Sequence, residues 1–491
     1  MSGQLLHDEE HDAPLDVQVQ RNQIFKEAVR CQAPDPCYAR NLRRSGYRER
    51  HGKISDYRFA PFAKDPTLVM LAKTLRRFGL GRMAHNTLLG TFWQFSRIAG
   101  QAAWVIVIAR ILGPSGYGTF AGIAGLATTL SGLTGLGTGF LLLQNVSRDH
   151  SAFDTHWRKA MLTTLYSGVL LAALFCTITH LVVRDRAGIE VIAAIGLSEV
   201  VCYPLVYAAG FAFQAHERLG WSGALATMMS GARLCAVIVF WFSATTRDLA
   251  TYAWFHLAAS VLCALGTLTM VQIVLRPSRA RFVLRVREIS EGLSFSAVWF
   301  TGNAVTELDK TLALRLAGSE IAGIYSVAYR IVSALTLPVA ALALAAQPRL
   351  FRQSTNKAGG DQYLVGQLAL VATLYGFAAS ALLLLLAGML PSLLGHAFEP
   401  AVRAVRLLVF VPPFFALRLI GSTVLMATGR QIMRALIEVP GIFLLIGLAL
   451  LWIPKYGLAG IAMTVTTTEA LLAAGIWGVL WQTRRRKLET P

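Results

Sequence analysis

Four arginines lie deep inside long apolar stretches of this 491-residue chain, where a charged side chain is costly. Arg97, for example, lies about ten residues into its stretch, which is roughly 15 Å along a helix. A guanidinium at that depth usually faces a cavity or a partner, and it binds phosphate oxygens bidentately. The set therefore suits an anionic group with several phosphate oxygens, such as a diphosphate. Its members are Arg97, Arg233, Arg330 and Arg418.

Acidic residues in the same stretches leave a second interpretation open, because each arginine can pair with an internal carboxylate and only hold helices together. Glu307 and Lys310 stand three residues apart, which places them on one helix face and predicts an ion pair. Asp309 points away from that helix face. The candidates for carrying a coupling Na⁺ or H⁺ are Asp309, Glu307 and Glu199. The internal acids are Glu199, Glu307, Asp309, Glu438 and Glu469.

The elements that must position these side chains are about twelve apolar stretches between residues 86 and 482. A stretch of about 20 apolar residues crosses the hydrocarbon core as a helix, because the backbone must satisfy its own hydrogen bonds there. The composition agrees, with 55% hydrophobic and 15% charged residues. The sequence therefore predicts an all-α polytopic membrane protein. The predicted spans are 87–112, 117–143, 160–183, 190–213, 220–242, 250–275, 292–316, 320–347, 363–394, 401–427, 433–453 and 457–481.

The formal net charge of +19 is concentrated between the predicted spans and in the two tails. No nucleic-acid-binding motif accompanies it, so nucleic acid is not an expected partner. Loops rich in Lys and Arg alternate with loops that contain few, which places both termini in the cytosol. Cys31 and Cys37, with His7 and His11, offer zinc-ligand residue types, but ordinary cysteines in a polar cytosolic tail are favoured. No metal site is therefore predicted.

The segments outside the spans complete the predicted organisation. Residues 1–66 are polar with little apolar periodicity, which predicts a disordered cytosolic leader. Residues 67–85 place apolar side chains at helical spacing among Lys and Arg, which predicts a basic amphipathic helix at the membrane surface. Alternatively, translation starts at Met70 or Met83. The other predicted parts are an N-terminal six-helix bundle (86–275), a basic cytosolic linker (276–290), a C-terminal six-helix bundle (291–482) and a basic cytosolic tail (483–491).

An internal repeat divides the spans into two halves. The stretch from Arg110 to Phe120 (RILGPSGYGTF) matches the stretch from Arg315 to Tyr325 (RLAGSEIAGIY) at an offset of 205 residues. Both copies follow odd-numbered spans, so two six-helix halves are expected to enter the membrane in the same orientation. Parallel repeats of this kind are a transporter architecture.

Glycines and prolines within the spans predict local features of the helices. Pro338 and the pair Pro412-Pro413 interrupt helical hydrogen bonding, so bends are expected there. Four glycines in the second span lack the Lys-Ser/Thr of a phosphate loop, so they predict close helix packing. They are Gly132, Gly135, Gly137 and Gly139.

Four segments, in their order and spacing, carry a resemblance to a known family. The first span and turn read NTLLGTFWQFSRIAGQAAWVIVIARILGPSGYGTFA, and the second half begins LDKTLALRLAGSEIAGIYSVAYRIVSALTLPVAALALAAQPRLF. LMATGRQ follows the tenth span, and KYGLAGIAMT opens the twelfth. Together they resemble the Wzx-type oligosaccharide flippases of the multidrug/oligosaccharidyl-lipid/polysaccharide (MOP) exporter superfamily. The resemblance covers residues 86–482, whereas the leader departs from the family, whose members usually begin just before the first span.

The resemblance implies two six-helix bundles arranged as a V, the MOP or MATE fold, working by alternating access. It implies undecaprenyl-diphosphate-linked oligosaccharide as cargo, moved to the outer leaflet of the bacterial inner membrane for exopolysaccharide or lipopolysaccharide (O-antigen) synthesis. Relatives bind the diphosphate with cavity arginines, and some use Na⁺ or H⁺ gradients, so no other cofactor is expected. Besides the lipid-linked cargo and the bilayer, the expected partners are a polysaccharide polymerase and chain-length or export proteins.

Two other functions remain open from the sequence. A MATE-like exporter of small cationic molecules needs an acid-rich, aromatic cavity, whereas the deep arginines disfavour cationic cargo. A membrane-bound polysaccharide polymerase or ligase needs a sizeable outer loop, and every predicted outward loop is short. No ATP-binding phosphate loop is present in the sequence. The flippase is therefore the expected function, and no enzymatic activity is expected.

Overall fold

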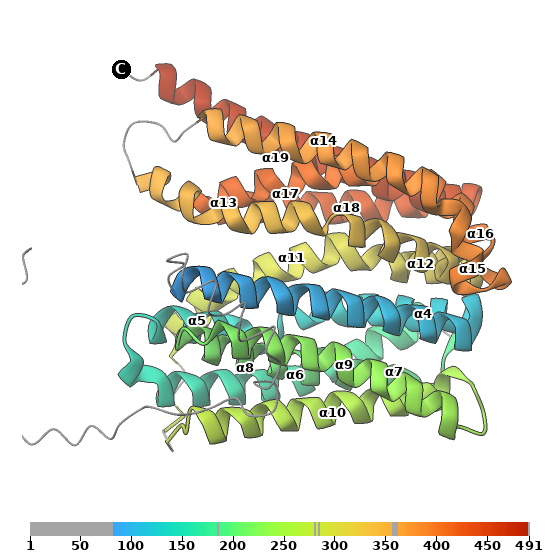
Figure 1. The fold of residues 1–491 in the computed structure, drawn as a ribbon, viewed down its shortest axis with the longest axis horizontal. Coiled ribbons are helices and arrows are strands. Elements are labelled where there is room, and N and C mark those ends of the chain that lie inside the picture. The colour runs from blue at the N-terminus through green and yellow to red at the C-terminus, as the bar shows by residue number, and fades with distance from the viewer. Residues whose placement is uncertain (1–81, 184–185, 279–280, 283–284, 356–361, 490–491) are drawn as a thin grey trace, which may run out of the picture. The chain divides into compact units, whose positions relative to one another are not determined.

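The computed structural model describes residues 82–183, 186–278, 281–282, 285–355 and 362–489 of the chain. The predicted leader and residues 67–81 of the predicted surface helix lie outside this part of the chain. Within it, every regular element is a helix, as the apolar patterning predicted. The helix labels used below are those of Figure 1.

The helices fall into two halves on either side of the predicted linker. The first half contains α4 (Arg82–Ser131), η1 (Thr134–Gly137), α5 (Thr138–Val146), η2 (His150–Ala152), α6 (Phe153–Val183), α7 (Ile189–Gly196), the π-helix η4 (Leu197–Cys202), α8 (Tyr203–Ala215), α9 (Leu219–Ser243) and α10 (Leu249–Val274). The second half contains α11 (Val286–Ala317), α12 (Ser319–Leu335), α13 (Leu337–Thr355), α14 (Gln362–Leu386), η5 (Ala387–Met389), α15 (Leu390–Leu394), η6 (His396–Phe398), α16 (Pro400–Leu407), α17 (Val411–Ala427), α18 (Gln431–Tyr456) and α19 (Leu458–Glu489).

The predicted spans correspond to these helices. By length and composition, eight helical runs among the described residues can cross a membrane, or ten when each bent pair counts as one span. The run Phe92–Val146 holds two predicted spans, because α4 breaks at Gly113, where φ is 67° and ψ is −179°. α11 is not among those runs, since it carries several charged residues, but it covers the predicted span 292–316. Counting the run Phe92–Val146 as two spans and adding α11 brings the ten spans to twelve, so the described helices account for all twelve predicted spans.

Two spans are bent next to the prolines that predicted the bends. α12 and the first turns of α13 meet at an angle of 41°, just before Pro338. The run His396–Leu407 meets α17 at 58°, just before Pro412 and Pro413. Proline lacks an N–H donor and its ring clashes with the preceding turn, so a new helix tends to start with it.

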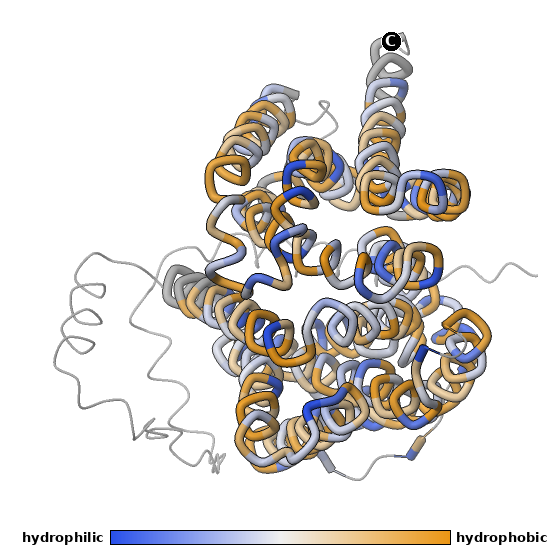
Figure 2. Tube along the Cα trace, turned by 90° about the vertical axis from the view of Figure 1, so that its right-hand side faces the viewer, coloured by the Kyte–Doolittle hydropathy of each residue, from blue (hydrophilic) through white to orange (hydrophobic). Residues whose placement is uncertain are grey.

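Large apolar side chains cover much of the outer surface of the helices. Leu170, Phe242 and Leu385 are 73%, 83% and 78% exposed, respectively. Figure 2 looks along the helices and shows hydrophobic residues throughout them, with hydrophilic residues scattered in between. Such a surface is unfavourable in water but suits contact with lipid, because the helices satisfy their own backbone hydrogen bonds.

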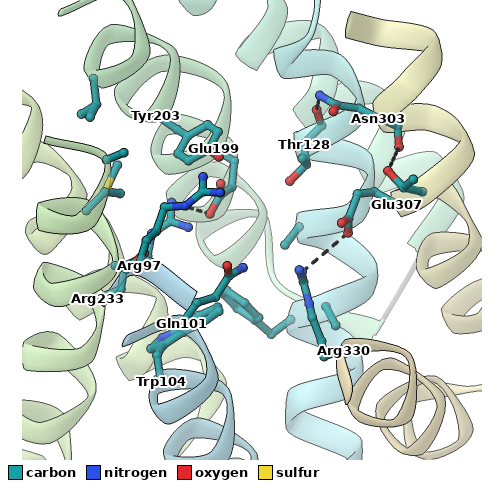
Figure 3. Close-up of a pocket in the computed structure, with 18 of the residues that line it drawn as sticks. Arg97, Gln101, Trp104, Thr128, Glu199, Tyr203, Arg233, Asn303, Glu307 and Arg330 are labelled. Atoms are coloured by element: carbon teal, nitrogen blue, oxygen red, sulfur yellow. Dashed lines mark hydrogen bonds and ion pairs between the residues drawn. The ribbon is translucent and has the colours of Figure 1, made fainter. Parts of the chain in front are cut away.

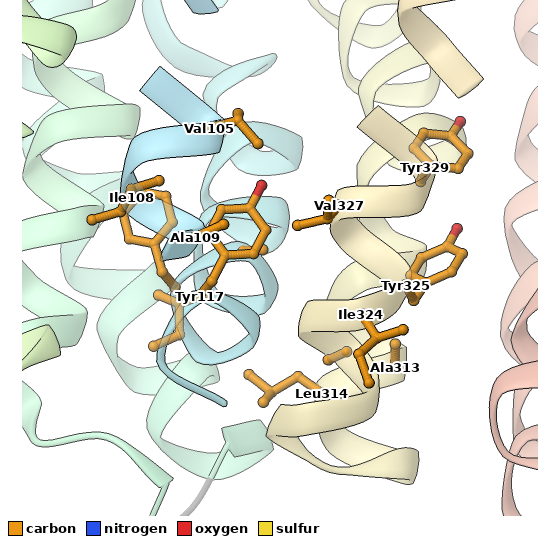
Figure 4. Close-up of a cluster of buried hydrophobic side chains, with 14 of the residues drawn as sticks. Val105, Ile108, Ala109, Tyr117, Ala313, Leu314, Ile324, Tyr325, Val327 and Tyr329 are labelled. Carbon is orange, nitrogen blue, oxygen red and sulfur yellow. The ribbon is translucent and has the colours of Figure 1, made fainter. Parts of the chain in front are cut away.

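The core that joins the two halves lies where α4, α11 and α12 meet (Figure 4). Tyr117, Leu314 and Tyr325 are fully or almost fully buried in it. α11 also contacts α18 and lies between α4 and α18 in Figure 1. These helices therefore fix the geometry of the interface between the halves.

Glycines allow α11 to approach the second span closely, as the sequence predicted. A Cβ added to Gly137 would lie 2.0 Å from the carbonyl oxygen of Gly292, and one added to Gly132 would lie 2.7 Å from the Cα of Phe300. Both distances are far below van der Waals contact, so only glycine fits at these two positions.

The internal repeat appears in the way α4 and α12 touch. Gly118 and Gly323 are equivalent positions of the repeat, and so are Pro114 and Ser319. A Cβ on Gly118 would lie 1.8 Å from the carbonyl oxygen of Ser319, and one on Gly323 would lie 1.9 Å from that of Pro114. Each contact is the repeat-related counterpart of the other, because the roles of the first and second halves are swapped between them. α4 and α12 therefore pack around a local pseudo-two-fold axis. We call this set of four residues the glycine contact.

The Asp248→Ala variant is expected to lose about 1 kcal/mol of stability at neutral pH, because Asp248 caps α10. Its carboxylate accepts a hydrogen bond of 3.0 Å from the N–H of Thr251. Hydrogen bonds from the hydroxyl and N–H of Thr251 lower the pKa of Asp248 below its ordinary value. The stabilisation is therefore complete above the unfolded-state pKa, roughly 3.9, and is lost as the pH falls through the folded-state pKa.

Thermal unfolding in detergent as a function of pH measures this effect. The difference between wild type and Asp248→Ala should shrink below about pH 4. Asp248→Asn is the control, because it keeps an oxygen acceptor that does not titrate, and it should melt close to wild type at pH 7. Equal losses in both variants would contradict a capping role.

Candidate functional site

A cavity of about 230 Å³ lies between helices of the two halves. Its walls come from α4, η4, α8 and α9 of the first half and from α11 and α12 of the second. Three of the four predicted arginines line it, namely Arg97 on α4, Arg233 on α9 and Arg330 on α12. Figure 3 shows Arg97 and Arg233 on one side of the cavity and Arg330 on the other. We call it the arginine cavity.

Arg233 is paired with Glu199, one of the acids predicted for ion coupling. The distance from Arg233 Nη2 to Glu199 Oε1 is 2.7 Å, and the same oxygen lies 3.1 Å from Nε2 of the fully buried His256. Glu199 lies in the π-helix η4, and π-helical turns are frequent at functional sites. The guanidinium of Arg233 also lies 5.5 Å from the ring centroid of Tyr203, within reach of a cation–π contact.

Arg330 faces Glu307, the second acid predicted for ion coupling. Arg330 Nη2 lies 3.6 Å from Glu307 Oε2, which is also 3.2 Å from Lys310 Nζ. The ion pair predicted between Glu307 and Lys310 is thus present. Glu307 interacts with both Lys310 and Arg330. The ion pair between Arg330 and Glu307 is therefore longer and weaker than the one between Arg233 and Glu199.

Asp309, the third acid predicted for ion coupling, lies behind the cavity wall. Its Oδ1 is 3.1 Å from Lys310 Nζ, and its Oδ2 accepts a hydrogen bond from the Tyr325 hydroxyl. The side chain of Asp309 is buried among the helices of the second half and is not among the residues that line the arginine cavity. The expectation that Asp309 points away from the Glu307–Lys310 pair was therefore wrong, because the long side chain of Lys310 reaches both carboxylates.

Arg97 is the arginine of the cavity that has no carboxylate within ion-pair distance among the described residues. Its Nη1 donates a hydrogen bond of 3.2 Å to the hydroxyl of Tyr207. Its Nε is buried and has no hydrogen-bond partner in the part of the chain that the structure describes. Arg97 therefore keeps most of its capacity to bind an anion.

The cavity is electropositive, and its donors are incompletely satisfied. Three arginines and two glutamates line it, which leaves its walls with one net positive charge. The Nε atoms of all three arginines are buried and have no hydrogen-bond partner among the residues that the structure describes. An unsatisfied buried donor costs about 1–3 kcal/mol, and more when it is charged. The arrangement is therefore complementary to an anionic group with several oxygen atoms.

The structure does not bring Arg418 to this cavity, although the sequence grouped it with the other three. Arg418 on α17 forms two contacts with Glu469 on α19, at 2.5 Å for Nε–Oε2 and 3.0 Å for Nη2–Oε1. Both side chains are buried within the second half. Arg418 thus fits the alternative interpretation, in which an internal ion pair holds helices together.

Removing one partner of this pair is expected to destabilise the protein strongly. We expect the Glu469→Ala variant to lose about 3–5 kcal/mol, because Arg418 is then left charged and unpaired inside the protein. Thermal unfolding in detergent is the measurement. The matched control is Glu291→Ala, which breaks the exposed pair with Arg287 on α11 and should cost less than about 1 kcal/mol. Similar losses in the two variants would contradict the structural role of the buried pair.

Several polar and aromatic residues of the cavity were missed by the sequence prediction. Gln101 and Trp104 line the cavity beside Arg97, four and seven positions after it on α4. That spacing places all three on one helix face, so the sequence contained this signal. Asn303 likewise precedes Glu307 by four positions and donates a 3.0 Å hydrogen bond to the carbonyl oxygen of Thr128.

Comparison with known proteins places this cavity in a recognised fold. A family model described as polysaccharide biosynthesis protein matches residues 83–354. No curated protein matches the chain. Among solved structures, this chain is similar to a multidrug resistance MATE family transporter of the MOP superfamily. For the inward-facing conformation the TM-score is 0.62 at 16% identity, covering 82% of this chain and 96% of that one.

The chain is also similar to a multidrug resistance MATE family transporter in its outward-facing conformation. The TM-score is 0.56 at 16% identity, and the match covers 82% of this chain and 97% of the other. A MOP superfamily transporter from Pyrococcus furiosus, reported to have a binding pocket of reverse polarity, is similar with a TM-score of 0.56 at 16% identity. That match covers 83% of this chain and 95% of the other. The family model spans more than half of the chain, and the solved structures share the fold of its two six-helix halves. The chain therefore belongs to the polysaccharide biosynthesis protein family and has the fold of these MOP superfamily transporters.

Proposed function

We propose that this protein is a transporter that flips undecaprenyl-diphosphate-linked oligosaccharide repeat units across the bacterial inner membrane by alternating access. The observation that carries the proposal is the set of three arginines around one cavity, each with a buried Nε that lacks a partner. A diphosphate supplies several charged oxygen acceptors within a short span, and guanidinium groups bind such oxygens in pairs. The isoprenoid tail remains in the bilayer while the charged headgroup enters the cavity.

The carboxylates of the cavity offer a route to ion coupling. Diphosphate binding competes with Glu199 for Arg233 and with Glu307 for Arg330, because each arginine already holds a carboxylate. A carboxylate that loses its arginine is left unpaired in a poorly hydrated site, which is costly unless it takes up H⁺ or Na⁺. We infer that cargo binding is linked to cation uptake because the diphosphate displaces Glu199 from Arg233 and Glu307 from Arg330.

The glycine contact supports one of the two closed arrangements that alternating access requires. With both termini in the cytosol, the turns at Gly113 and Gly318 lie at the outer side of the membrane, and Gly118 and Gly323 follow them directly. The contact therefore joins the two halves at the outer side of the arginine cavity. Separating it opens the route to the outer leaflet, where a polysaccharide polymerase takes over the cargo.

A MATE-like exporter of cationic molecules is the second candidate, because the fold is shared. The cavity opposes it, since both acids that line the cavity are already paired with arginines and the walls keep a net positive charge. Pocket polarity is reported to differ within the superfamily for the Pyrococcus furiosus transporter. We therefore propose no cationic cargo.

Reconstituted liposomes test the proposal. The probe is a polyprenyl-diphosphate-linked disaccharide with a fluorescent label on the sugar, placed in both leaflets and quenched from outside by a membrane-impermeant reductant. Wild-type protein should make the protected fraction accessible to the reductant, whereas protein-free liposomes and liposomes with Arg97→Ala should not. The same probe with a monophosphate linkage is the specificity control. Probe accessibility equal to that of protein-free liposomes would contradict the proposal.

A further inference from the structure

A second, smaller cavity of about 60 Å³ adjoins the arginine cavity. The two share Tyr203 and Tyr207 as wall residues. The smaller one is otherwise lined mainly by Phe140 on α5, Phe211 on α8 and Trp299 on α11, together with glycines and hydroxyl side chains. We call it the aromatic pocket, and it lies between the same two halves as the arginine cavity.

The aromatic side chains of this pocket form one connected cluster. Ring centroids are 4.6 Å apart for Phe140 and Phe211, 5.4 Å for Phe140 and Trp299, and 5.6 Å for Tyr207 and Trp299. Phe295 stacks on Phe140 at 5.5 Å. The neighbouring rings fix the position of the Trp299 indole, which is nevertheless 37% exposed. Part of a large, well-positioned aromatic surface is therefore open.

The pocket also contains a hydroxyl group without a partner. Ser296 lies one helical turn before Trp299 and is 2% exposed, and its Oγ makes no hydrogen bond within the described ranges of the chain. Buried polar atoms are nearly always paired, so an unpaired one in a cavity wall indicates a position for a ligand group. The ligand must combine an apolar face for the rings with a hydroxyl or similar group for Ser296.

A pyranose ring has this combination. Its axial C–H groups form a weakly electropositive apolar face that suits the electron-rich face of an aromatic ring, and its hydroxyl groups point outward around the rim. We propose that the aromatic pocket binds the first sugar of the cargo, stacked on Trp299 with a hydroxyl group on Ser296. This inference rests on the proposed function, because it takes the sugar to be attached to the diphosphate.

The position of Tyr207 connects the two sites. Its ring lies in the cluster with Trp299, and its hydroxyl accepts the hydrogen bond from Arg97. In a sugar diphosphate the first ring follows the second phosphate directly, so a diphosphate on Arg97 places that ring beside Tyr207. The pocket adjoins the arginine cavity at the shared wall residues Tyr203 and Tyr207, so a ring stacked on Trp299 can extend toward that cavity. The pocket confers selectivity for the glycan, and the arginines confer affinity for the diphosphate.

Equilibrium binding to purified protein in detergent tests this assignment. The probes are farnesyl diphosphate and a panel of its glycosyl esters that carry glucose, galactose or N-acetylglucosamine, measured by titration calorimetry. Wild type should bind at least one ester about tenfold more tightly than farnesyl diphosphate. Trp299→Ala should lose that gain but keep its affinity for farnesyl diphosphate within about twofold. Trp299→Tyr should retain most of the gain, because an aromatic face remains.

The controls distinguish a failure of the sugar assignment from a failure of the proposed diphosphate site. Trp254 on α10 is 55% exposed and lines neither cavity, so Trp254→Ala should bind every probe as wild type does. The sugar assignment is overturned if no ester gains affinity in wild type, or if Trp299→Ala weakens all probes equally. Failure of wild type to bind farnesyl diphosphate itself would instead contradict the arginine site. Melting temperatures of all variants show whether Trp299→Ala is folded, and Trp299→Tyr and Ser296→Ala test the same pocket with smaller changes.

Discussion

The Arg97→Ala variant should fail to export polysaccharide while it still inserts into the membrane. Arg97 is free of carboxylates among the described residues, so its guanidinium has more binding capacity to lose than that of Arg233 or Arg330. A hydrogen bond to a charged group contributes about 1.5–3 kcal/mol, so losing Arg97 should weaken diphosphate binding by roughly 10- to 150-fold. Polymer output from cells, normalised to the amount of protein in the membrane, is the measurement.

Two further variants make this prediction specific. Arg97→Lys keeps the charge but not the bidentate geometry, so partial export is expected. The double variant Arg97→Ala/Arg330→Ala removes one guanidinium from each side of the cavity and should be inactive. Arg287→Ala is the matched control, because the side chain of Arg287 is 88% exposed and Arg287 is not among the residues that line the arginine cavity. Normal polymer output from the double variant would contradict diphosphate binding by these arginines.

A single added methyl group at the glycine contact should also abolish transport. In Gly118→Ala the new Cβ would lie 1.8 Å from the carbonyl oxygen of Ser319, whereas ordinary contact begins near 3.4 Å. The neighbouring atoms are backbone, so α4 and α12 must separate by about 1.6 Å to admit it. The variant cannot close this contact, and a transporter that cannot close one side cannot alternate. Export should fall by at least about tenfold.

Cross-linking reports the closure directly. Ser115 Oγ and Ser319 Oγ lie 2.8 Å apart across the contact, so cysteines at these positions should form a disulfide on oxidation in an otherwise cysteine-free background. Gly118→Ala should reduce the cross-linked fraction. Gly447→Ala on α18 is the control, because no atom lies within 4 Å of its added Cβ and alanine favours a helix. Full cross-linking and full export in Gly118→Ala would show that the contact is not required.

The sequence predicted the helices of this protein well, and the reason is physical. Hydrocarbon thickness requires long apolar stretches, and that requirement is visible in one dimension. The break at Gly113 and the bends near Pro338 and Pro412 follow from backbone chemistry that is equally local. The repeat was also visible, and the structure adds that its copies contact each other through Gly118 and Gly323.

The site was only partly predictable, because depth in a span does not tell which way a side chain points. Arg233 and Arg418 both lie deep in apolar spans, yet one lines the cavity and the other is paired with Glu469. That pair joins residues 51 positions apart on different helices, and no spacing rule reveals it. The π-helix that carries Glu199 was likewise not predicted from the sequence.

The aromatic pocket escaped the sequence prediction for a related reason. Phe140, Tyr207 and Trp299 are far apart in the chain and come from α5, α8 and α11. Each is an unremarkable aromatic residue within its own apolar span. Only the packing of the two halves brings the rings together beside Arg97 and shows Ser296 to be unpaired.

Titration of purified protein with farnesyl diphosphate and farnesyl monophosphate tests most directly whether the arginine cavity is a diphosphate site. Wild type should prefer the diphosphate by at least about tenfold, and Arg97→Ala/Arg330→Ala should lose both the affinity and the preference. Binding should also weaken as salt concentration rises, since the contact is largely electrostatic. Equal affinity for the two ligands in wild type, or unchanged diphosphate affinity in the double variant, would contradict a diphosphate site formed by these arginines.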